Sequence, residues 1–240
     1  MNKSKYLIFG ISKGLGKALV KYLPKKEDVI FGISRTKPDY LKEYPNVKWI
    51  KADLAAPINS TRILKKIIQD EPIDYLIYNV GIWEKEGFTN NYSFEKSSQT
   101  EILNILNTNV AACILSIQAV IDNLKKSNKS KIILIGSTWA LDNHNGKEVS
   151  FSASKFALRG IAHSLRETLR EHSIGISILN FGTLATEYEV EQGSQIVLEE
   201  QKGHSIPLSD AIQAVQFIIS TTSASCVKEI NMPAMKDKNI

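Results

Sequence analysis

The sequence predicts one α/β domain built on a doubly wound parallel sheet, and three observations support this. First, short apolar runs alternate with longer segments of helical periodicity, which is typical of strand–helix–strand units with right-handed crossovers. Second, several runs are apolar almost throughout, as strands covered on both faces are. Third, the 240 residues show no composition break, low-complexity stretch or repeat, so they fit a single domain.

The expected elements follow from these runs. Strands are expected at 6–10, 29–33, 47–50, 75–78, 131–135, 175–179 and 227–230. Helices are expected at 15–23, 59–70, 98–127, 152–172 and 208–220. The segment 184–207 has only a weak pattern, and we interpret it as a mobile substrate flap near the site.

Composition and charge exclude several other classes of protein. Apolar residues make up 43% of the chain and charged residues 23%, the mixture of an ordinary soluble globular protein. The net charge of +5 comes from scattered lysines, so we expect no nucleic-acid partner, although a basic surface suits phosphate-bearing ligands. The first ten residues lack the apolar core of a signal peptide, and no run of about 18 apolar residues predicts a membrane span.

The two cysteines, Cys113 and Cys226, lie far apart in the sequence. They form neither a disulfide framework nor a metal-ligand spacing, so we expect no metal site. A reduced, cytoplasmic location is the simplest expectation for such a chain.

A glycine-rich loop follows the first expected strand. Residues 10–16 read Gly-Ile-Ser-Lys-Gly-Leu-Gly, and an expected helix begins within this loop. Glycines allow a sharp turn and a close approach to a pyrophosphate, while the helix N-terminus offers free N–H groups and a positive dipole end. We therefore predict a dinucleotide site with contacts from Gly10, Ser12, Lys13, Gly14, Leu15 and Gly16.

The end of the second expected strand indicates which dinucleotide binds. An acidic residue at about this distance from the loop would bind the ribose 2′-OH of NAD. Here the strand ends in Ser34 and Arg35, and Lys13 lies in the glycine loop. These groups can bond a 2′-phosphate that a carboxylate would repel, so we expect NADP(H). The alternative is that Lys13 and Arg35 are only solvated surface charges.

Further motifs occur at the ends of the later strands and along the expected helices 98–127 and 152–172. They are Asp53-Leu54, Asn79-Val80-Gly81, Asn107-Thr108-Asn109, Gly136-Ser137, Phe151-Ser152-Ala153-Ser154-Lys155 and Asn180-Phe181-Gly182-Thr183-Leu184-Ala185-Thr186. With the glycine loop, this series resembles the short-chain dehydrogenase/reductase family from residue 6 to residue 232. Departures include Phe9, where the family has threonine before the loop, and Phe181, where it has proline.

The resemblance implies a Rossmann-type fold and further cofactor contacts. These would come from Asp53, Leu54, Asn79, Gly81, Lys155, Gly182, Leu184 and Thr186. Asp53 would accept a hydrogen bond from the adenine amino group, although a helix N-cap is the alternative. The resemblance also implies a homodimer or homotetramer built on the helices 98–127 and 152–172.

The resemblance assigns catalytic roles as well. Ser137 would orient the substrate oxygen, Lys155 would hold the nicotinamide ribose, and Asn109 would hold a water of the proton relay. As a bare observation, Asn109 could equally be a hydrogen-bonded core residue. The family has a tyrosine one helical turn before the lysine, and its hydroxyl exchanges a proton with the substrate. Phe151 stands there and has no proton to give.

Three explanations of Phe151 stay open from the sequence. The chain is an engineered variant of a tyrosine enzyme, a natural member whose proton comes from elsewhere, or a cofactor-binding protein without turnover. His144 and Tyr188 lie in segments that could reach the site as substitute donors, although each could be an ordinary surface residue.

We therefore expect an NADP(H)-dependent oxidoreductase that acts on a small carbonyl or alcohol compound, with proton transfer impaired or altered. The alternative is a non-catalytic NADP-binding regulatory or scaffold protein. Substrate contacts are expected from 138–149 and 184–207, and Trp83, Trp139 and Tyr188 suggest an aromatic or apolar wall.

Overall fold

The computed structural model describes residues 3–238, and within them seven parallel strands form one sheet. The sheet order is β3-β2-β1-β4-β5-β6-β7. Because the order reverses between β1 and β4, this is a doubly wound sheet, as the sequence predicted. The strands are β1 (Lys5–Phe9), β2 (Val29–Ser34), β3 (Val47–Lys51), β4 (Tyr75–Tyr78), β5 (Lys131–Ile135), β6 (Gly175–Phe181) and β7 (Glu229–Met232).

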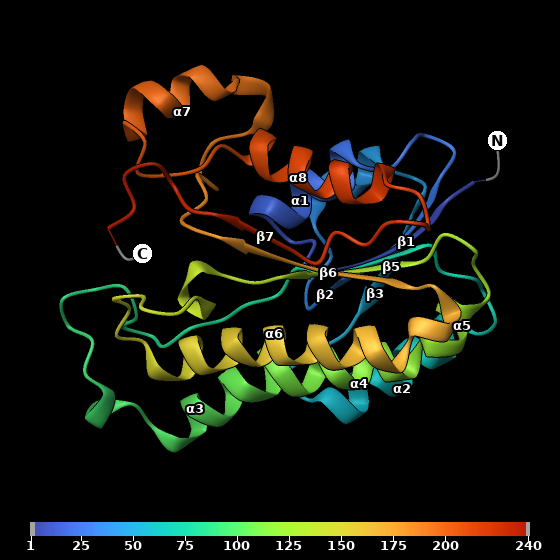
Figure 1. Ribbon diagram of the computed structural model, residues 1–240, viewed down its shortest axis with the longest axis horizontal. Coiled ribbons are helices and arrows are strands. Elements are labelled where there is room, and N and C mark those ends of the chain that lie inside the picture. Colours follow the sequence, from blue (N-terminus) through green and yellow to red (C-terminus); the bar gives the residue numbers. More distant parts are fainter. Residues whose placement is uncertain (1–2, 239–240) are drawn as a thin grey trace.

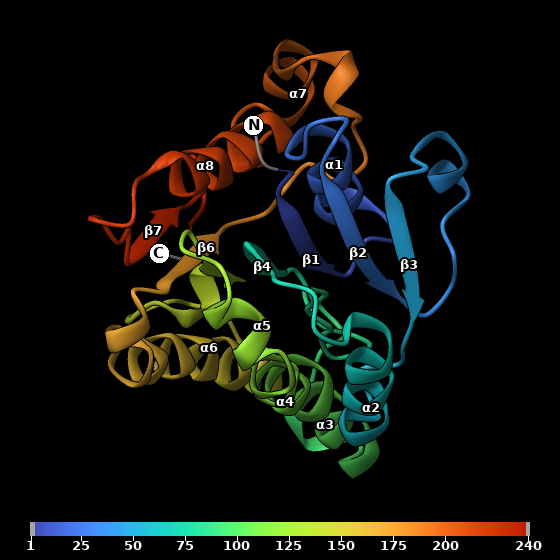
Figure 2. The same cartoon turned by 90° about the vertical axis from the view of Figure 1, so that its right-hand side faces the viewer.

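Helices cover both faces of the sheet (Figure 1). One layer holds α1 (Gly14–Tyr22), α7 (Ser194–Gln201) and α8 (Leu208–Ser220). The other holds α2 (Pro57–Ile68), α3 (Gln99–Leu106), α4 (Ala112–Ala119), α5 (Ile121–Lys125) and α6 (Val149–Thr168). Figure 2 shows the two layers on either side of the strands.

The alternation of side chains along each strand produces two apolar cores. In β1, Leu7 and Phe9 point toward the α2–α4–α6 layer, whereas Tyr6 and Ile8 point toward α1 and α8. Leu7, Ile8 and Phe9 are fully buried. This two-sided burial explains why the run is apolar at successive positions, as central parallel strands are.

The expected helix 98–127 is in fact interrupted. A π-helical turn at Asn107–Ala111 separates α3 from α4, and a second break at Val120 separates α4 from α5. Apolar periodicity cannot register a π turn, because the pattern continues through the inserted residue. The last strand begins at Glu229, two residues later than expected; its side chains are only partly buried, so its apolar pattern is weak.

Residues 99–119 are long and apolar enough to span a membrane by length and composition alone. In the structure these residues belong to the helix layer of α2, α3, α4, α5 and α6 (Figure 1). Within this layer α4 contacts α2, and α3 contacts α6. A buried helix of a core passes the same test of composition, so the absence of a membrane partner stays a prediction.

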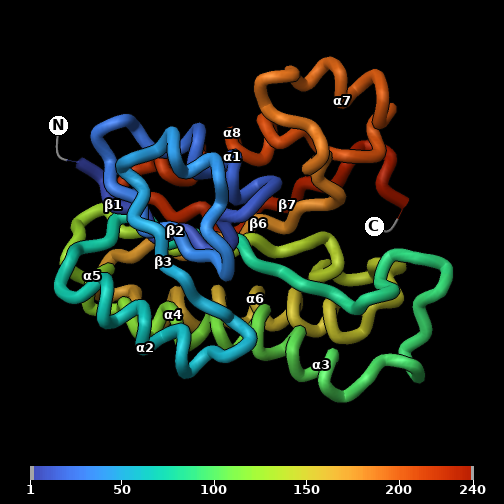
Figure 3. The backbone as a smooth tube through the Cα atoms, turned by 180° about the vertical axis from the view of Figure 1, so that it is seen from behind, coloured from blue at the N-terminus to red at the C-terminus, as the bar shows by residue number. Residues whose placement is uncertain are grey.

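The segment 184–207 projects beside the sheet and carries α7, as Figure 3 shows from behind. Leu184 and Ile206 pair in a parallel bridge at the two ends of the segment. Gly193 and Gly203 have φ of +85° and +84°, which only glycine adopts readily. Lys17 and Lys21 of α1 form ion pairs with Glu189 and Glu191 of the segment.

Candidate active site

One cleft of about 1220 Å³ opens at the carboxyl ends of the strands. This is where open α/β sheets bind ligands, beside the point where the strand order reverses. All the site residues predicted from the sequence line this cleft except Gly16 and Asn109. The structure thus brings most of the predicted residues together in one cleft, and the two exceptions have structural reasons described below.

The glycine loop between β1 and α1 has a conformation that side chains would prevent. Gly10 has a φ of +77°, and a Cβ there would lie 2.1 Å from the carbonyl oxygen of Asn79. A Cβ on Gly16 would lie 1.9 Å from the carbonyl oxygen of Gly10. Gly16 thus packs the helix onto the strand without facing the cleft, whereas Gly10 and Gly14 leave an open cradle beside the helix N-terminus.

The N-terminus of α1 is available to an anion. Lys13 is the N-cap residue and makes no side-chain cap bond, and the first turn holds no acidic residue. The first-turn N–H groups therefore lack an acidic side-chain partner, and they lie at the positive end of the helix dipole. This arrangement fits the pyrophosphate of a dinucleotide.

The far end of the cleft carries the groups expected at the adenosine ribose. Lys13 and Arg35 both line it and are exposed. Ser34 lines it too, but its hydroxyl donates to the carbonyl of Thr36 at 2.8 Å and accepts from the indole of Trp49 at 2.9 Å. The hydroxyl hydrogen of Ser34 is thus already engaged, which leaves the two cations as the main partners for a 2′-phosphate.

Asp53 also borders this end of the cleft. The N-cap of α2 is Ala56, so Asp53 does not cap that helix. Its carboxylate accepts a hydrogen bond from the N–H of Ala55 at 3.1 Å. Asp53 and Leu54 both line the cleft, at the end where the family resemblance implies the adenine.

Lys155 lies at the base of the cleft and is only 4% exposed. Its Nζ donates to the carbonyl of Ile135 at 3.1 Å and lies 5.5 Å from the ring centroid of Phe151. A Cβ on Gly81 would come within 2.9 Å of that Nζ, so a larger residue there would displace the ammonium group. Burial lowers the pKa of Lys155 to about 8, while nearby Cys113 has a smaller opposite effect.

A buried carboxylate fixes the start of α6. Glu84 is 1% exposed, and its Oε1 accepts hydrogen bonds from the N–H groups of Ser150 at 2.8 Å and Phe151 at 3.3 Å. An anion at a helix N-terminus is favourable. Glu84 thereby sets the position of Phe151 and of Lys155 one turn later. No motif in the sequence marks this acid, and it was missed.

Ser137 and Asn109 differ in how they face the cleft. Ser137 lines the cleft at the end of β5, and its hydroxyl accepts from the N–H of Trp139 at 3.2 Å. The hydroxyl hydrogen stays free to meet a substrate oxygen. Asn109 is fully buried in the π turn, where its amide bonds both backbone groups of Ile82 and the hydroxyl of Ser154. Its hydrogen bonds join the π turn to the segment at Ile82 and to α6, which is a structural role.

The sixth strand contributes the remaining cofactor residues. Gly182, Leu184 and Thr186 line the cleft in sequence. The methyl group of Thr186 lies where a Cβ on Gly14 would meet it at 3.1 Å, so the loop after β6 closes directly over the glycine loop. The two segments, distant in sequence, thus form opposite sides of one phosphate cradle.

Neither residue expected as a substitute proton donor lines the cleft. His144 stacks on Trp139 with its ring centroid 6.1 Å away, and its Nε2 lies 2.9 Å from the hydroxyl of Ser152. The hydroxyl of Tyr188 bonds Glu200 and Gln201 on α7. Lys155 is therefore the buried acid of the cleft that lies next to Phe151.

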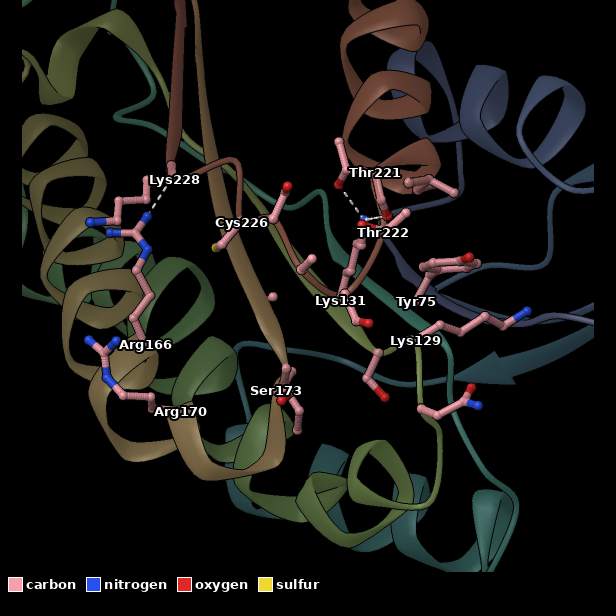
Figure 4. A pocket seen from close by; sticks show the side chains of 18 of the residues that line it. Tyr75, Lys129, Lys131, Arg166, Arg170, Ser173, Thr221, Thr222, Cys226 and Lys228 are labelled. Carbon is pink, nitrogen blue, oxygen red and sulfur yellow. Dashed lines mark hydrogen bonds between the residues drawn. The ribbon is translucent and has the colours of Figure 1, made fainter.

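A second cavity of about 450 Å³ lies at the opposite end of the sheet (Figure 4). Lys131 is buried there and donates to backbone carbonyls at the end of α8 and to the hydroxyl of Thr221. Arg166 donates to the carbonyls of Ile176 and Lys228. These cations donate hydrogen bonds to free carbonyl groups at the end of α8 and to carbonyl groups of β6 and the segment before β7, so their role is structural. The cleft at the carboxyl ends of the strands is therefore the candidate active site.

Proteins that bind a dinucleotide at the carboxyl edge of a doubly wound sheet form the Rossmann-type class, and this chain has that architecture. The sequence model of the family described as short chain dehydrogenase matches residues 5–196. Because this match covers most of the chain, the protein belongs to the short-chain dehydrogenase/reductase family of oxidoreductases. The family binds NAD or NADP and acts on small carbonyl or alcohol compounds.

A curated relative supports the same family, and solved structures share the fold. The chain is 30% identical over 195 residues to the 3-oxoacyl-(acyl-carrier-protein) reductase of Buchnera aphidicola, covering 78% of this chain and 76% of that one. A metagenomic short-chain oxidoreductase in complex with NADP superposes with a TM-score of 0.75 at 19% identity, covering 97% and 98% of the two chains. An NADH-dependent reductase of alginate metabolism gives 0.79 at 18% identity, covering 98% of each.

Proposed function

We propose that this protein is an NADP(H)-dependent reductase or dehydrogenase that transfers hydride between the nicotinamide and a small carbonyl or alcohol compound. One observation carries the proposal: the glycine cradle, the cationic pair Lys13 and Arg35, and the buried Lys155 all lie in a single cleft. The cleft thus offers separate places for a pyrophosphate, a 2′-phosphate and a reacting carbonyl. NADPH, when bound, supplies the hydride.

The side chains of this chain have distinct roles in the proposal. Ser137 donates to the substrate oxygen, because its hydroxyl hydrogen is not committed within the protein. Lys155 holds the ribose hydroxyls and places a positive charge where negative charge develops on that oxygen. Gly81 and Phe151 leave the lysine little water, which strengthens both interactions.

Proton transfer differs from that of the tyrosine enzymes in this proposal. Phe151 stands at the tyrosine position of the family pattern and cannot exchange a proton. The ammonium group of Lys155 is the acid beside it, and a pKa of about 8 lets it release a proton near neutral pH. We propose that Lys155 supplies the proton, directly or through a ribose hydroxyl.

The second candidate is a cofactor-binding protein without turnover. Phe151 favours it, since a site that lacks its usual acid keeps binding while losing rate. Both candidates predict tight NADPH binding, and they differ in NADPH consumption across a panel of ketones and aldehydes. Consumption on any panel member supports the reductase, and none, with binding demonstrated, supports the alternative.

Cofactor choice is tested by calorimetric titration of NADPH and NADH. Charge-assisted hydrogen bonds contribute about 1.5–3 kcal/mol each, so NADPH should bind at least tenfold more tightly. Lys13→Ala with Arg35→Ala should remove the preference. Lys26→Ala with Lys37→Ala, which removes two exposed charges outside the residues lining the cleft, is the matched control. Equal affinities in the parent protein would contradict the assignment.

The segment 184–207 is proposed to act as a flap over the bound cofactor. Its two ends are held together by the Leu184–Ile206 bridge, and its glycines at 193 and 203 provide hinges. A cytoplasmic location is also proposed, supported by two cysteines that are both free.

A further inference from the structure

Four aromatic side chains line the cleft next to Lys155, and we call them the aromatic wall: Trp83, Phe88, Trp139 and Phe151. The centroid of Phe88 lies 5.4 Å from that of Phe151 and 5.6 Å from that of Trp83, with interplanar angles of 85° and 72°. Trp83 and Phe151 meet at 6.3 Å and 84°. Each of these three rings thus meets the other two edge to face, the arrangement that aromatic quadrupoles favour.

A buried carboxylate holds the aromatic wall together. Glu148 is 5% exposed; its Oε1 accepts from the N–H of Phe88 at 2.8 Å, and its Oε2 accepts from the indole of Trp139 at 2.9 Å. Burial raises the pKa of the Glu148 carboxyl, but these bonds and that from Lys147 outweigh the effect and lower it below its usual value. Glu148 is therefore an anion whose oxygens are occupied by the wall itself.

The chain holds Phe88 in a strained conformation. Its φ of +65° lies in the left-handed region, which a bulky side chain rarely adopts. Strain of this kind persists where the surrounding structure enforces it, and such positions cluster at functional sites. Despite this, the residue Phe88 is 48% exposed, and Trp83 is 52% exposed. The molecule thus keeps two large apolar surfaces open to the cleft.

Nearby charges decide what kind of group can cover these rings. Aromatic faces attract cations in general. Here the ammonium of Lys155 already lies 5.5 Å from the centroid of Phe151, and Lys147 also lines the cleft. The carboxylates of Glu84 and Glu148 are buried beside these rings and balance the two lysines, so no excess of negative charge favours a cation here. A neutral planar ring, which adds another edge-to-face contact, fits the aromatic wall best.

We propose that the aromatic wall binds a neutral aromatic ring of the substrate, so that the cleft selects aryl ketones and aldehydes over aliphatic ones. The proposal rests on the proposed function for the position of the carbonyl beside Lys155. The ring contact is a statement about binding, and it is tested without turnover.

The test compares two ketones of equal carbon number, acetophenone and 2-octanone, on the protein saturated with NADP⁺, which cannot deliver a hydride. Their dissociation constants are measured by ligand-observed NMR. The aliphatic ketone is the more hydrophobic of the two, so area alone would favour it. We expect acetophenone to bind about five- to tenfold more tightly, since edge-to-face contacts add to burial.

Variants assign the preference to the aromatic wall. Phe88→Leu and Trp83→Leu keep an apolar side chain but remove a ring, and each should reduce the preference about threefold or more. Phe94→Leu is the matched control, because Phe94 is 50% exposed and does not line the cleft. Glu148→Gln replaces an acceptor oxygen with a donor and should lower the preference without changing NADP⁺ affinity, as expected for a positioning residue.

The outcomes separate this inference from the proposed function. Equal binding of the two ketones would overturn the proposal that the aromatic wall binds a substrate ring, even if NADPH is consumed. A preference for acetophenone that Phe88→Leu and Trp83→Leu leave intact would overturn it too. A preference that these variants remove, on a protein that never consumes NADPH, would retain the ring-binding site and reject the reductase. A parent protein that does not bind NADP⁺ would instead reject the proposed function at its first step.

Discussion

Lys155 and Phe151 lie one helical turn apart on α6 and together determine the chemistry of the cleft. Lys155 is buried, and within residues 3–238 its Nζ donates to one backbone carbonyl, that of Ile135, while the ring of Phe151 lies beside it. A positive charge in such a place costs folding free energy, because no carboxylate offsets its loss of water. That cost indicates that the lysine is kept for its effect on a ligand.

At the residue scale, Phe151→Tyr should create or raise carbonyl reductase activity. The new hydroxyl would extend from the ring that lies 5.5 Å from the Nζ of Lys155, whose charge lowers the pKa of the phenol. A positioned acid contributes about 10²-fold or more in rate. NADPH affinity should change little, because only one oxygen is added. Rates of NADPH oxidation on the same ketones check this, and an unchanged rate would contradict the expectation that a tyrosine hydroxyl is a better acid here than the ammonium group of Lys155.

Lys155→Met should stabilise the fold while weakening the cofactor complex. Methionine fills a similar volume without a buried charge, so the free energy of unfolding should rise by about 1–3 kcal/mol. NADPH affinity should fall at least tenfold, because a ribose contact is lost. Denaturant unfolding and calorimetry measure the two effects. A variant with parental NADPH affinity would count against the role of Lys155.

The gain in stability should depend on pH. Burial lowers the pKa of Lys155 from 10.5 to about 8, so in the folded protein the lysine loses its proton first. Below pH 8 the folded protein bears the full cost of the buried charge. Between about 8 and 10.5 the unfolded chain binds more protons, the stability of the parent rises with pH, and the advantage of methionine shrinks. An advantage that is constant from pH 7 to pH 10 would contradict this assignment.

At the scale of elements, the β1–α1 turn depends on its first glycine. Gly10→Ala would force a Cβ to within 2.1 Å of the Asn79 carbonyl at a φ of +77°. The loop must therefore move away from β4, and NADPH affinity should fall by about tenfold or more while the unfolding free energy drops by about 1–3 kcal/mol. Gly160→Ala is the control, because a Cβ there meets nothing within 4 Å. Equal effects of the two substitutions would contradict the role of the turn.

The strands and the glycine turn could be predicted from the sequence, because their signals are local. Buried parallel strands read as apolar runs, and the turn shows its glycines directly. The contacts around Glu84 and Glu148 could not be predicted. Glu148 bonds the N–H of Phe88 across 60 positions of the chain, and Glu84 bonds Ser150 across 66. Such partners become neighbours only when the loop after β4 packs against the start of α6 in the folded protein. No local sequence pattern therefore predicts these contacts.

At the scale of the whole molecule, α3, α4 and α6 leave apolar side chains uncovered. Leu103, Ile114 and Phe156 are exposed on this layer. We expect a homodimer or homotetramer that covers these side chains, measured as molar mass by light scattering at micromolar concentration. Ile114→Glu should shift the protein toward the monomer and leave NADPH affinity unchanged. Gln213→Glu, at an exposed site on α8 in the opposite helix layer, is the control. A parent that is monomeric at these concentrations would contradict the expectation.

The account as a whole states that a hydride passes between NADPH and a carbonyl carbon in this cleft. The most direct measurement uses NADPH with deuterium at both C4 positions of the nicotinamide, a panel that includes acetophenone, and both the parent protein and Phe151→Tyr. The account predicts an alcohol with one deuterium on the carbinol carbon, detected by mass spectrometry, with more product from Phe151→Tyr. Alcohol without deuterium, or no alcohol from either protein while calorimetry shows NADPH bound, would contradict it.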